Sequence, residues 1–229
     1  MWRRAVLLSS LLASPAIADV DLDDISLPPG FAIEVYAEVD DARSLALGGN
    51  GVVFVGSRGA DTVSAIFPGT AGRTRVFEID DDLDRPHGVA YKDGDLYVAE
   101  IDHVYAYRGI DGRLSNPPRR EELNIDLPRP STRNHQYRDI AFDPEGRLVV
   151  AIGAPCNVCD REGFGTIDRV KLDGSERETI AYGVRNSVGV AFHPDTGELW
   201  FTDNGRDMLG DDIPPDELNH LAEEGQHFG

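Results

Sequence analysis

The stretch GVAFHPDTGELWFTDNG (189–205) decides the fold. An apolar strand runs into a turn that contains glycine, and a second strand rich in branched and aromatic residues follows it. Two such strands around a glycine turn are typical of a β-hairpin. The same pattern occurs three more times, in SLALGGNGVVFVGSR (44–58), GVAYKDGDLYVAE (88–100) and DIAFDPEGRLVVAIG (139–153).

The four hairpins recur at a long, nearly regular distance. Their turn glycines are spaced 43, 52 and 51 residues apart, at Gly51, Gly94, Gly146 and Gly197. A period of about 40–50 residues built from short strands is typical of β-propeller blades, and the competing β-sandwich does not predict it. The outer strands of the blades are expected at 63–67, 74–79, 103–108, 168–172 and 178–183. Helical signal is confined to 214–224, where we expect a short helical turn.

Polar and titratable residues recur where each innermost strand begins. With the hairpins aligned on Ala46, Ala90, Ala141 and Ala191, the residues six positions earlier are Asp40, Asp84, His135 and Arg185. Five positions earlier stand Asp41, Arg85, Gln136 and Asn186, and three earlier stand Arg43, His87, Arg138 and Val188. Because a ring brings these positions together at one end of its channel, we expect a functional site there. Taken singly, each of them also reads as an ordinary solvated loop residue.

The first 18 residues read as an export signal. MWRRAVLLSSLLASPAIA combines two arginines, a short apolar run and the small-x-small end Ala16-Ile17-Ala18. The run is too short to span a bilayer, so we expect cleavage after Ala18 and a periplasmic or secreted protein without membrane insertion. The formal net charge of −19 disfavours nucleic-acid partners, because it repels phosphate backbones.

The two cysteines, Cys156 and Cys159, lie close together in GAPCNVCD. In an oxidising compartment such a pair is expected to form a disulfide. Haem attachment would require histidine at position 160, which is Asp160, and two cysteines cannot make a four-cysteine zinc site. A redox-active pair is the remaining alternative.

Several motifs resemble one enzyme family. LPPGFAIEVYA (27–37), RPHGVAY (85–91), GAPCNVC (153–159), the long block DGSERETIAYGVRNSVGVAFHPDTGELWFTDNGRD (173–207) and DELN (216–219) resemble the glucose/sorbosone dehydrogenases that depend on pyrroloquinoline quinone (PQQ). The resemblance covers essentially all of 19–229. It implies a six-bladed propeller, of which four blades are present, that oxidises an aldose, a pyranose or sorbosone with PQQ and Ca²⁺. An electron acceptor, a cytochrome or a quinone, would be the second partner.

The resemblance also implies roles for the residues at the strand starts. His135 matches the family histidine that acts as general base, and a neutral imidazole suits that task. Arg185 and Asn186 match the pair that lies against the quinone, and Arg43 is a candidate partner for a PQQ carboxylate. The backbone carbonyls of Gly205 and Arg206 match the position of Ca²⁺ ligands.

Two departures qualify the resemblance. The glucose-oxidising branch carries Gly-Asp after the third hairpin, whereas this chain has Gly153-Ala154, so a carboxylate that would orient His135 is missing. This favours the sorbosone or pyranose branch. The chain also stops at GQHFG, after the fourth hairpin. A Ca²⁺-dependent lactonase or strictosidine-synthase-like propeller hydrolase, with a side-chain metal shell, and a non-catalytic binding propeller remain the alternative functions.

Overall fold

The computed structural model describes residues 21–229, so the leader expected over 1–18 lies outside the described residues. Residues 21–36 form a unit of their own, with a 3-10 turn at Leu22–Asp24, and Ala37–Gly229 form the second unit. Within residues 21–229, none of the helices has the length and apolarity that a membrane crossing requires.

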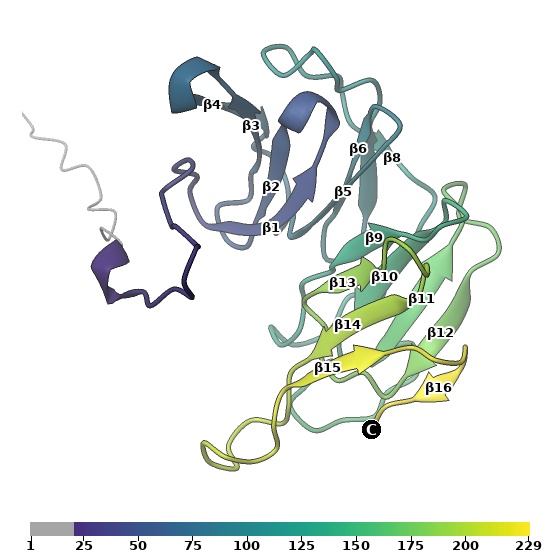
Figure 1. The fold of residues 1–229 in the computed structure, drawn as a ribbon. Coiled ribbons are helices and arrows are strands. Elements are labelled where there is room, and N and C mark those ends of the chain that lie inside the picture. The colour runs from purple at the N-terminus through teal and green to yellow at the C-terminus, as the bar shows by residue number, and fades with distance from the viewer. Residues whose placement is uncertain (1–20) are drawn as a thin grey trace, which may run out of the picture. The chain divides into compact units, whose positions relative to one another are not determined.

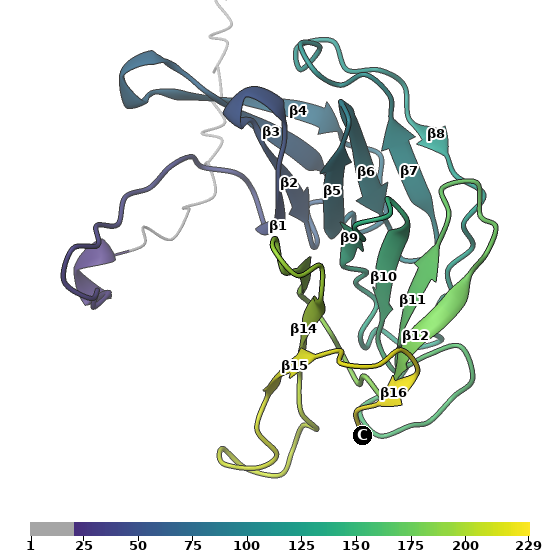
Figure 2. The same ribbon diagram turned by 45° about the vertical axis from the view of Figure 1, so that its right-hand side comes forward.

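The second unit is built from four mainly antiparallel sheets that follow one another around a common centre, as in a β-propeller (Figures 1 and 2). The first blade contains β1 (Ala42–Leu47), β2 (Val53–Ser57), β3 (Val63–Pro68) and β4 (Thr74–Asp80). The second contains β5 (Gly88–Lys92), β6 (Asp95–Ala99), β7 (Val104–Tyr107) and β8 (Glu121–Glu122). Short 3-10 turns at Gly49–Gly51 and Thr70–Gly72 connect strands of the first blade.

The third and fourth blades repeat the arrangement. The third contains β9 (Ile140–Phe142), β10 (Leu148–Ile152), β11 (Thr166–Val170) and β12 (Glu178–Tyr182), and β16 (Gln226–His227) joins it in parallel beside β12. The fourth contains β13 (Val190–Phe192), β14 (Leu199–Asp203) and β15 (Glu217–His220). The four hairpins expected from the sequence are therefore β1–β2, β5–β6, β9–β10 and β13–β14.

The turn glycines explain why each hairpin closes where it does. Gly51, Gly94, Gly146 and Gly197 have φ angles of 76°, 90°, 83° and 72°. A side chain with a Cβ atom rarely adopts this left-handed region, whereas glycine adopts it at little cost. The repeated glycine is thus a backbone requirement of the turn between the two inner strands of every blade.

One expectation is wrong. Residues 214–224 do not form a helical turn, because Glu217–His220 is the strand β15, which pairs with β14. Leu218 lies opposite Thr202 and Asn219 opposite Phe201 in this ladder. Pairing with a neighbouring strand satisfies the backbone groups that a helix would have satisfied internally, so tertiary context overrides the local helical preference.

The core lies between consecutive blades. Phe54 and Val63 of the first blade pack with Leu96 and Val98 of the second in one buried cluster. A second cluster joins the second blade to the third, and a third joins the third blade to the fourth. Because each interface is sealed by apolar side chains, the loops at the strand starts are held in fixed positions relative to one another.

Candidate functional site

The starts of the innermost strands come together at one end of the blades, as the repeat predicts. Between the second and third blades, Arg85 donates to the side-chain oxygen of Gln136. Between the third and fourth, the Ala154 amide donates to the Arg185 carbonyl at 2.7 Å. We use the name channel rim for the predicted site residues of this end: Arg43, Arg85, His135, Arg185 and Asn186.

His135 uses one ring nitrogen for support, and no hydrogen bond within residues 21–229 uses the other. Its Nδ1 lies 2.7 Å from the carbonyl oxygen of Ala154, which can only accept, so Nδ1 carries the proton of the neutral ring. The Nε2 lone pair is then available to accept a proton. Burial lowers the pKa of His135, the hydrogen bond to Ala154 opposes this change, and the nearby Arg185 adds to it. The imidazole is therefore neutral at pH 7.

Arg185 is held by its neighbours. Its Nε donates to the Asn157 carbonyl at 3.0 Å, and one terminal nitrogen donates to the Asn204 carbonyl at 2.9 Å. The other terminal nitrogen donates to Asn157 Oδ1 at 2.7 Å and to Asp207 at 2.8 Å. Of its five N–H groups, one is left without a hydrogen bond within residues 21–229. Arg185 thus contributes a fixed positive charge and a single free donor.

Asn186 is fixed by a carboxylate whose importance the sequence did not reveal. Asp203, at the end of β14, accepts hydrogen bonds from the backbone amides of Arg185 and Asn186 at 2.9 and 2.7 Å. Asp203 is buried, and this burial raises its pKa, although the two amides oppose the change. In the sequence it reads as one of several aspartates in an acidic stretch, and only its place at a strand end marks it.

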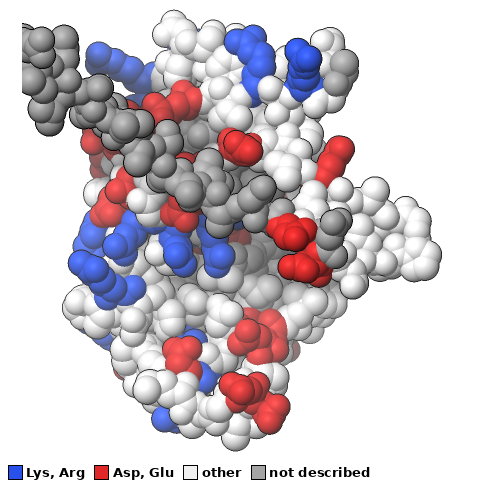
Figure 3. Space-filling view, turned by 90° about the vertical axis from the view of Figure 1, so that its left-hand side faces the viewer, with Lys and Arg blue, Asp and Glu red and all other residues white. Residues whose placement is uncertain are grey.

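The first two blades contribute positive charge to the same end. Arg43 and Arg58 are both exposed, and the charge of each lowers the pKa of His87, so both guanidinium groups lie in the neighbourhood of His87. Within the described chain, neither has an ion-pair partner. Figure 3 shows one face on which several Lys and Arg side chains lie together, with Asp and Glu side chains beside them and elsewhere on the same face. The two exposed guanidinium groups can attract an anionic ligand.

Two of the recurring polar positions serve the fold instead. His87 is buried, and this burial is the main reason why its pKa falls to about 4. Its ring packs against Tyr137. Arg138 is fully buried and donates to the carbonyls of Ile101, Pro128 and His135. The contact with His135 fixes the backbone of the candidate base, whose φ of 47° is unusual for a residue with a side chain.

The loop after β14 carries the carbonyls expected to bind Ca²⁺. The Gly205 amide donates to Asp216 at 2.8 Å, which anchors the loop, and Arg206 is exposed. Over residues 21–229, no hydrogen bond uses the carbonyl oxygens of Gly205 or Arg206. In the same range, no group of three or more His, Cys, Asp or Glu side chains is placed to hold a metal ion.

Cys156 and Cys159 form a disulfide, as expected. The bridge closes a short loop, and Asn157 of this loop contacts the Arg185 side chain. A hollow of about 560 Å³ adjoins this loop, and its lining includes Ala154, Asn157, Arg185 and Arg206. Arg185 is the rim residue that borders this hollow.

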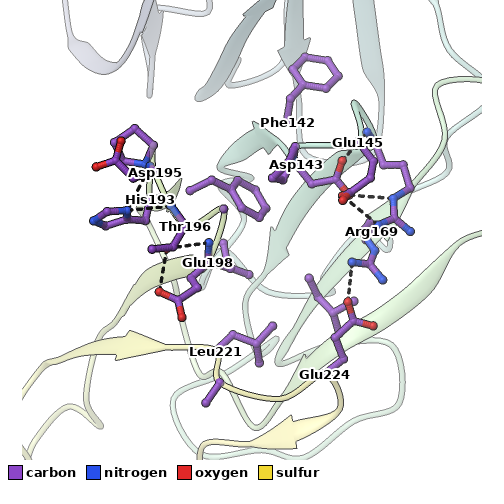
Figure 4. Close-up of a pocket in the computed structure, with 18 of the residues that line it drawn as sticks. Phe142, Asp143, Glu145, Arg169, His193, Asp195, Thr196, Glu198, Leu221 and Glu224 are labelled. Carbon is purple, nitrogen blue, oxygen red and sulfur yellow. Dashed lines mark hydrogen bonds and ion pairs between the residues drawn. The ribbon is translucent and has the colours of Figure 1, made fainter.

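A second hollow, of about 680 Å³, lies at the other end of the third and fourth blades, between their hairpin turns (Figure 4). Its charged side chains are largely neutralised within the protein: Arg147 pairs with Asp143 at 2.7 Å, and Arg169 pairs with Glu224 at 2.7 Å. None of the predicted site residues lines it. We therefore assign the candidate functional site to the channel rim.

Comparison with known proteins identifies the family. The model of the family described as Glucose / Sorbosone dehydrogenase matches residues 112–229. An uncharacterised protein of Borreliella burgdorferi is 30% identical over 231 residues, which cover 96% of this chain and 60% of that protein.

Solved structures share the fold. An AA12 family carbohydrate-active enzyme of Trichoderma reesei superposes with a TM-score of 0.70 at 20% identity, over 82% of this chain and 55% of that one. Its calcium structure gives 0.67, at 20% identity and 81% and 53% coverage. The holo form of the PQQ domain of pyranose dehydrogenase from Coprinopsis cinerea gives 0.67 at 15% identity, with 80% and 51% coverage. The chain thus spans about half to 60% of the length of these proteins.

Proposed function

Because the chain belongs to the glucose/sorbosone dehydrogenase family, we propose that it takes part in the PQQ-dependent oxidation of a sugar or sugar aldehyde, with His135 as the general base. The observation that carries the proposal is the state of the imidazole. Its Nδ1 is engaged with Ala154 at 2.7 Å, its pKa is lowered, and its Nε2, which has no hydrogen bond to the described residues, can accept a proton.

The base acts on the hydroxyl group of the substrate. As hydride leaves the carbon of an alcohol or hydrated aldehyde, its O–H proton must be removed, and a neutral imidazole within hydrogen-bond reach can take it. Ala154 then stabilises the Nδ1–H of the imidazolium that forms, while Arg185 disfavours that cation. Burial and the charge of Arg185 keep His135 neutral until the reaction takes place.

The rim residues suit the proposed cofactor. PQQ carries three carboxylates, and Arg43 and Arg58 offer two exposed guanidinium groups without ion pairs in the described chain. Asn186 offers an amide, and Arg185 offers its charge and one free donor. When bound, PQQ supplies the hydride acceptor. The chain supplies position, positive potential and the base.

The loop after β14 suits Ca²⁺. The carbonyls of Gly205 and Arg206 are free of hydrogen bonds among the described residues, and hard cations take oxygen ligands. The calcium structure of the Trichoderma reesei enzyme and the holo form of the PQQ domain from Coprinopsis cinerea support this pair of cofactors.

The substrate class and the location are part of the proposal. The Gly153-Ala154 sequence places no carboxylate beside His135, which favours a sorbosone or pyranose substrate over the glucose branch. The leader over 1–18 favours export to the periplasm or beyond. Reoxidation of the reduced cofactor then requires a cytochrome or quinone acceptor in that compartment.

The test is a cofactor titration followed by substrate. PQQ and Ca²⁺ are added to the full-length protein, and the reduced quinone is followed spectroscopically while sorbosone and a panel of aldoses are added. We expect Arg43→Ala with Arg58→Ala to weaken PQQ binding by at least about tenfold, since each lost charged hydrogen bond costs roughly 1.5–3 kcal/mol. Arg113→Ala is the control, because this exposed arginine lies beyond β7, at the other end of the blade. Failure of PQQ to bind would overturn the proposal.

A further inference from the structure

The segment after β10 packs directly against His135. Gly153 is buried, and a Cβ atom added to it would lie 2.6 Å from His135 Cβ and 3.0 Å from Asn186 Oδ1. Real Cβ atoms do not approach other atoms so closely, so glycine is required for the backbone of this segment to reach the imidazole.

Ala154 then bridges two blades through its backbone. Its carbonyl accepts the Nδ1–H of His135 at 2.7 Å, and its amide donates to the carbonyl of Arg185 at 2.7 Å. The acceptor that fixes the ring is thus a peptide carbonyl, whose position depends on where this segment is held.

Asn157, inside the loop that the disulfide closes, holds the segment through its side chain. Its side-chain oxygen accepts hydrogen bonds from Arg185 at 2.7 Å and from the Asp207 amide at 2.9 Å. Its side-chain nitrogen donates to the Asp207 carbonyl at 3.3 Å. The bridge between Cys156 and Cys159 closes the loop around Asn157 and limits the conformations open to it.

We propose that segment 153–159 is the positioning device of the base: the Ala154 carbonyl fixes the Nδ1–H tautomer of His135, and Asn157, inside the disulfide loop, keeps that carbonyl in place. The inference rests on the proposed function, since it assumes that the unprotonated Nε2 of this tautomer acts as the general base. It adds Ala154 and Asn157 as positioning residues and gives the disulfide a role beyond stability.

The acceptor of the His135 Nδ1–H is a peptide carbonyl and not a carboxylate, and this difference affects the basicity of the ring. A carboxylate in this place would stabilise the imidazolium by its charge, whereas a carbonyl accepts the same hydrogen bond without a negative charge. Two charged groups act on the ring: Arg185 lowers its pKa and Asp207 raises it. The carbonyl therefore fixes the tautomer with less support for the imidazolium than a carboxylate would give, and burial keeps the pKa of His135 below its ordinary value.

The tautomer is measured directly by nitrogen NMR of the full chain labelled at its histidines, with His135→Gln used to assign the signal. We expect His135 to show a protonated Nδ1 and an unprotonated Nε2 at neutral pH. His193 is the internal control, because its Nδ1 accepts from the amides of Asp195 and Thr196, which requires the opposite tautomer. A protonated Nε2 on His135, or an equal mixture of tautomers, would overturn the proposal.

The role of the loop is tested in Cys156→Ser with Cys159→Ser, and separately in Asn157→Ala. We expect both to shift His135 toward a mixture of tautomers while His193 keeps its own. A variant in which the His193 signal is also lost has not folded, and the milder Asn157→Ser then takes its place. If His135 keeps a single Nδ1–H tautomer in a folded variant, the loop does not position it.

The two proposals fail in different ways. The NMR measurement needs neither PQQ nor turnover, so it stands when the protein proves inactive toward sugars. In active protein, we expect Asn157→Ala to lower kcat by up to about 10²-fold, the cost of a base misplaced by about 1 Å, with little change in PQQ affinity. An unchanged kcat together with an unchanged tautomer would contradict the positioning role and leave the sugar oxidation intact.

Discussion

Ser44, on the innermost strand of the first blade, donates a hydrogen bond of 3.2 Å to the carboxylate of Asp139, which precedes the innermost strand of the third. The second oxygen of this carboxylate accepts the Val190 amide of the fourth blade at 2.8 Å. Asp139 is buried, so one side chain connects three blades at the centre of the molecule. Burial raises the pKa of Asp139 to about 6, against the opposition of these hydrogen bonds.

The raised pKa of Asp139 predicts a pH-dependent stability. A carboxyl that binds its proton more tightly in the folded state contributes stability that is fully present below its unfolded pKa of 3.8 and is lost as the pH rises through about 6. The loss is roughly 3 kcal/mol. Asp139→Asn keeps a neutral group in place and should lack this component between pH 4 and 7 in denaturant unfolding.

The exposed Asp211→Asn serves as the control for that comparison. If Asp139→Asn and the parent protein lose stability in parallel from pH 4 to pH 7, the carboxyl does not titrate in this window.

The disulfide predicts an absence of reactive thiols. Cys156 and Cys159 are bonded to each other, so thiol labelling of the native, unreduced protein should modify neither residue. The bridge closes a short loop, so reduction should cost less than the roughly 3 kcal/mol expected for a loop of 15 residues. Two labelled cysteines in native protein would show that the bond does not form.

Gly153→Ala tests the close approach to the candidate base. The added Cβ atom would lie 2.6 Å from His135 Cβ, so one of the two segments must move. We expect a loss of roughly 1–3 kcal/mol in unfolding free energy, as for other overpacked sites, and a drop in turnover of up to about 10²-fold. Gly189→Ala is the matched control, because its Cβ would make an ordinary contact at 3.5 Å with Thr202. Equal effects of the two variants would argue against the contact.

The outer faces of the first and fourth blades predict self-association. Leu45 and Leu47 lie on one face of the first blade with 64% and 72% of their surface exposed, and Leu218 of the fourth blade is 69% exposed. Exposed apolar patches on sheets favour association. Leu45→Lys with Leu47→Lys should shift the 229-residue chain toward monomer in sedimentation velocity. Val158→Lys, which adds a charge in the disulfide loop, should leave the association state unchanged. An equal shift from Val158→Lys and from the Leu45/Leu47 double variant would point to net charge alone.

The repeat made most of the fold predictable. Alternating strands and a glycine at each turn reflect local requirements, so the four hairpins and their outer strands stand where the sequence predicts them. The strand Glu217–His220 could not be predicted in this way, because its conformation depends on pairing with β14 rather than on its own residues.

The repeat points to part of the candidate site, whereas the residues that support it through tertiary contacts could not be found from the sequence. Alignment of the hairpins points to His135 and Arg185, and the structure brings their segments together through Ala154. The alignment does not reveal that Arg138 is buried or that Asn157 and Asp203 hold the rim. These side chains bond to partners tens of residues away, and a local pattern carries no record of such partners.

The most direct test of the account is the rate at which protein-bound PQQ is reduced by sugar in His135→Ala. Removal of the general base should lower this rate by about 10²–10⁴-fold and abolish the acidic limb of the pH profile, which lies below the ordinary histidine pKa of 6.5. PQQ binding should change little, and His193→Ala, at the opposite end of the fourth blade, should keep the parent rate. A His135→Ala protein that reduces PQQ at the parent rate, with the acidic limb intact, would contradict the account.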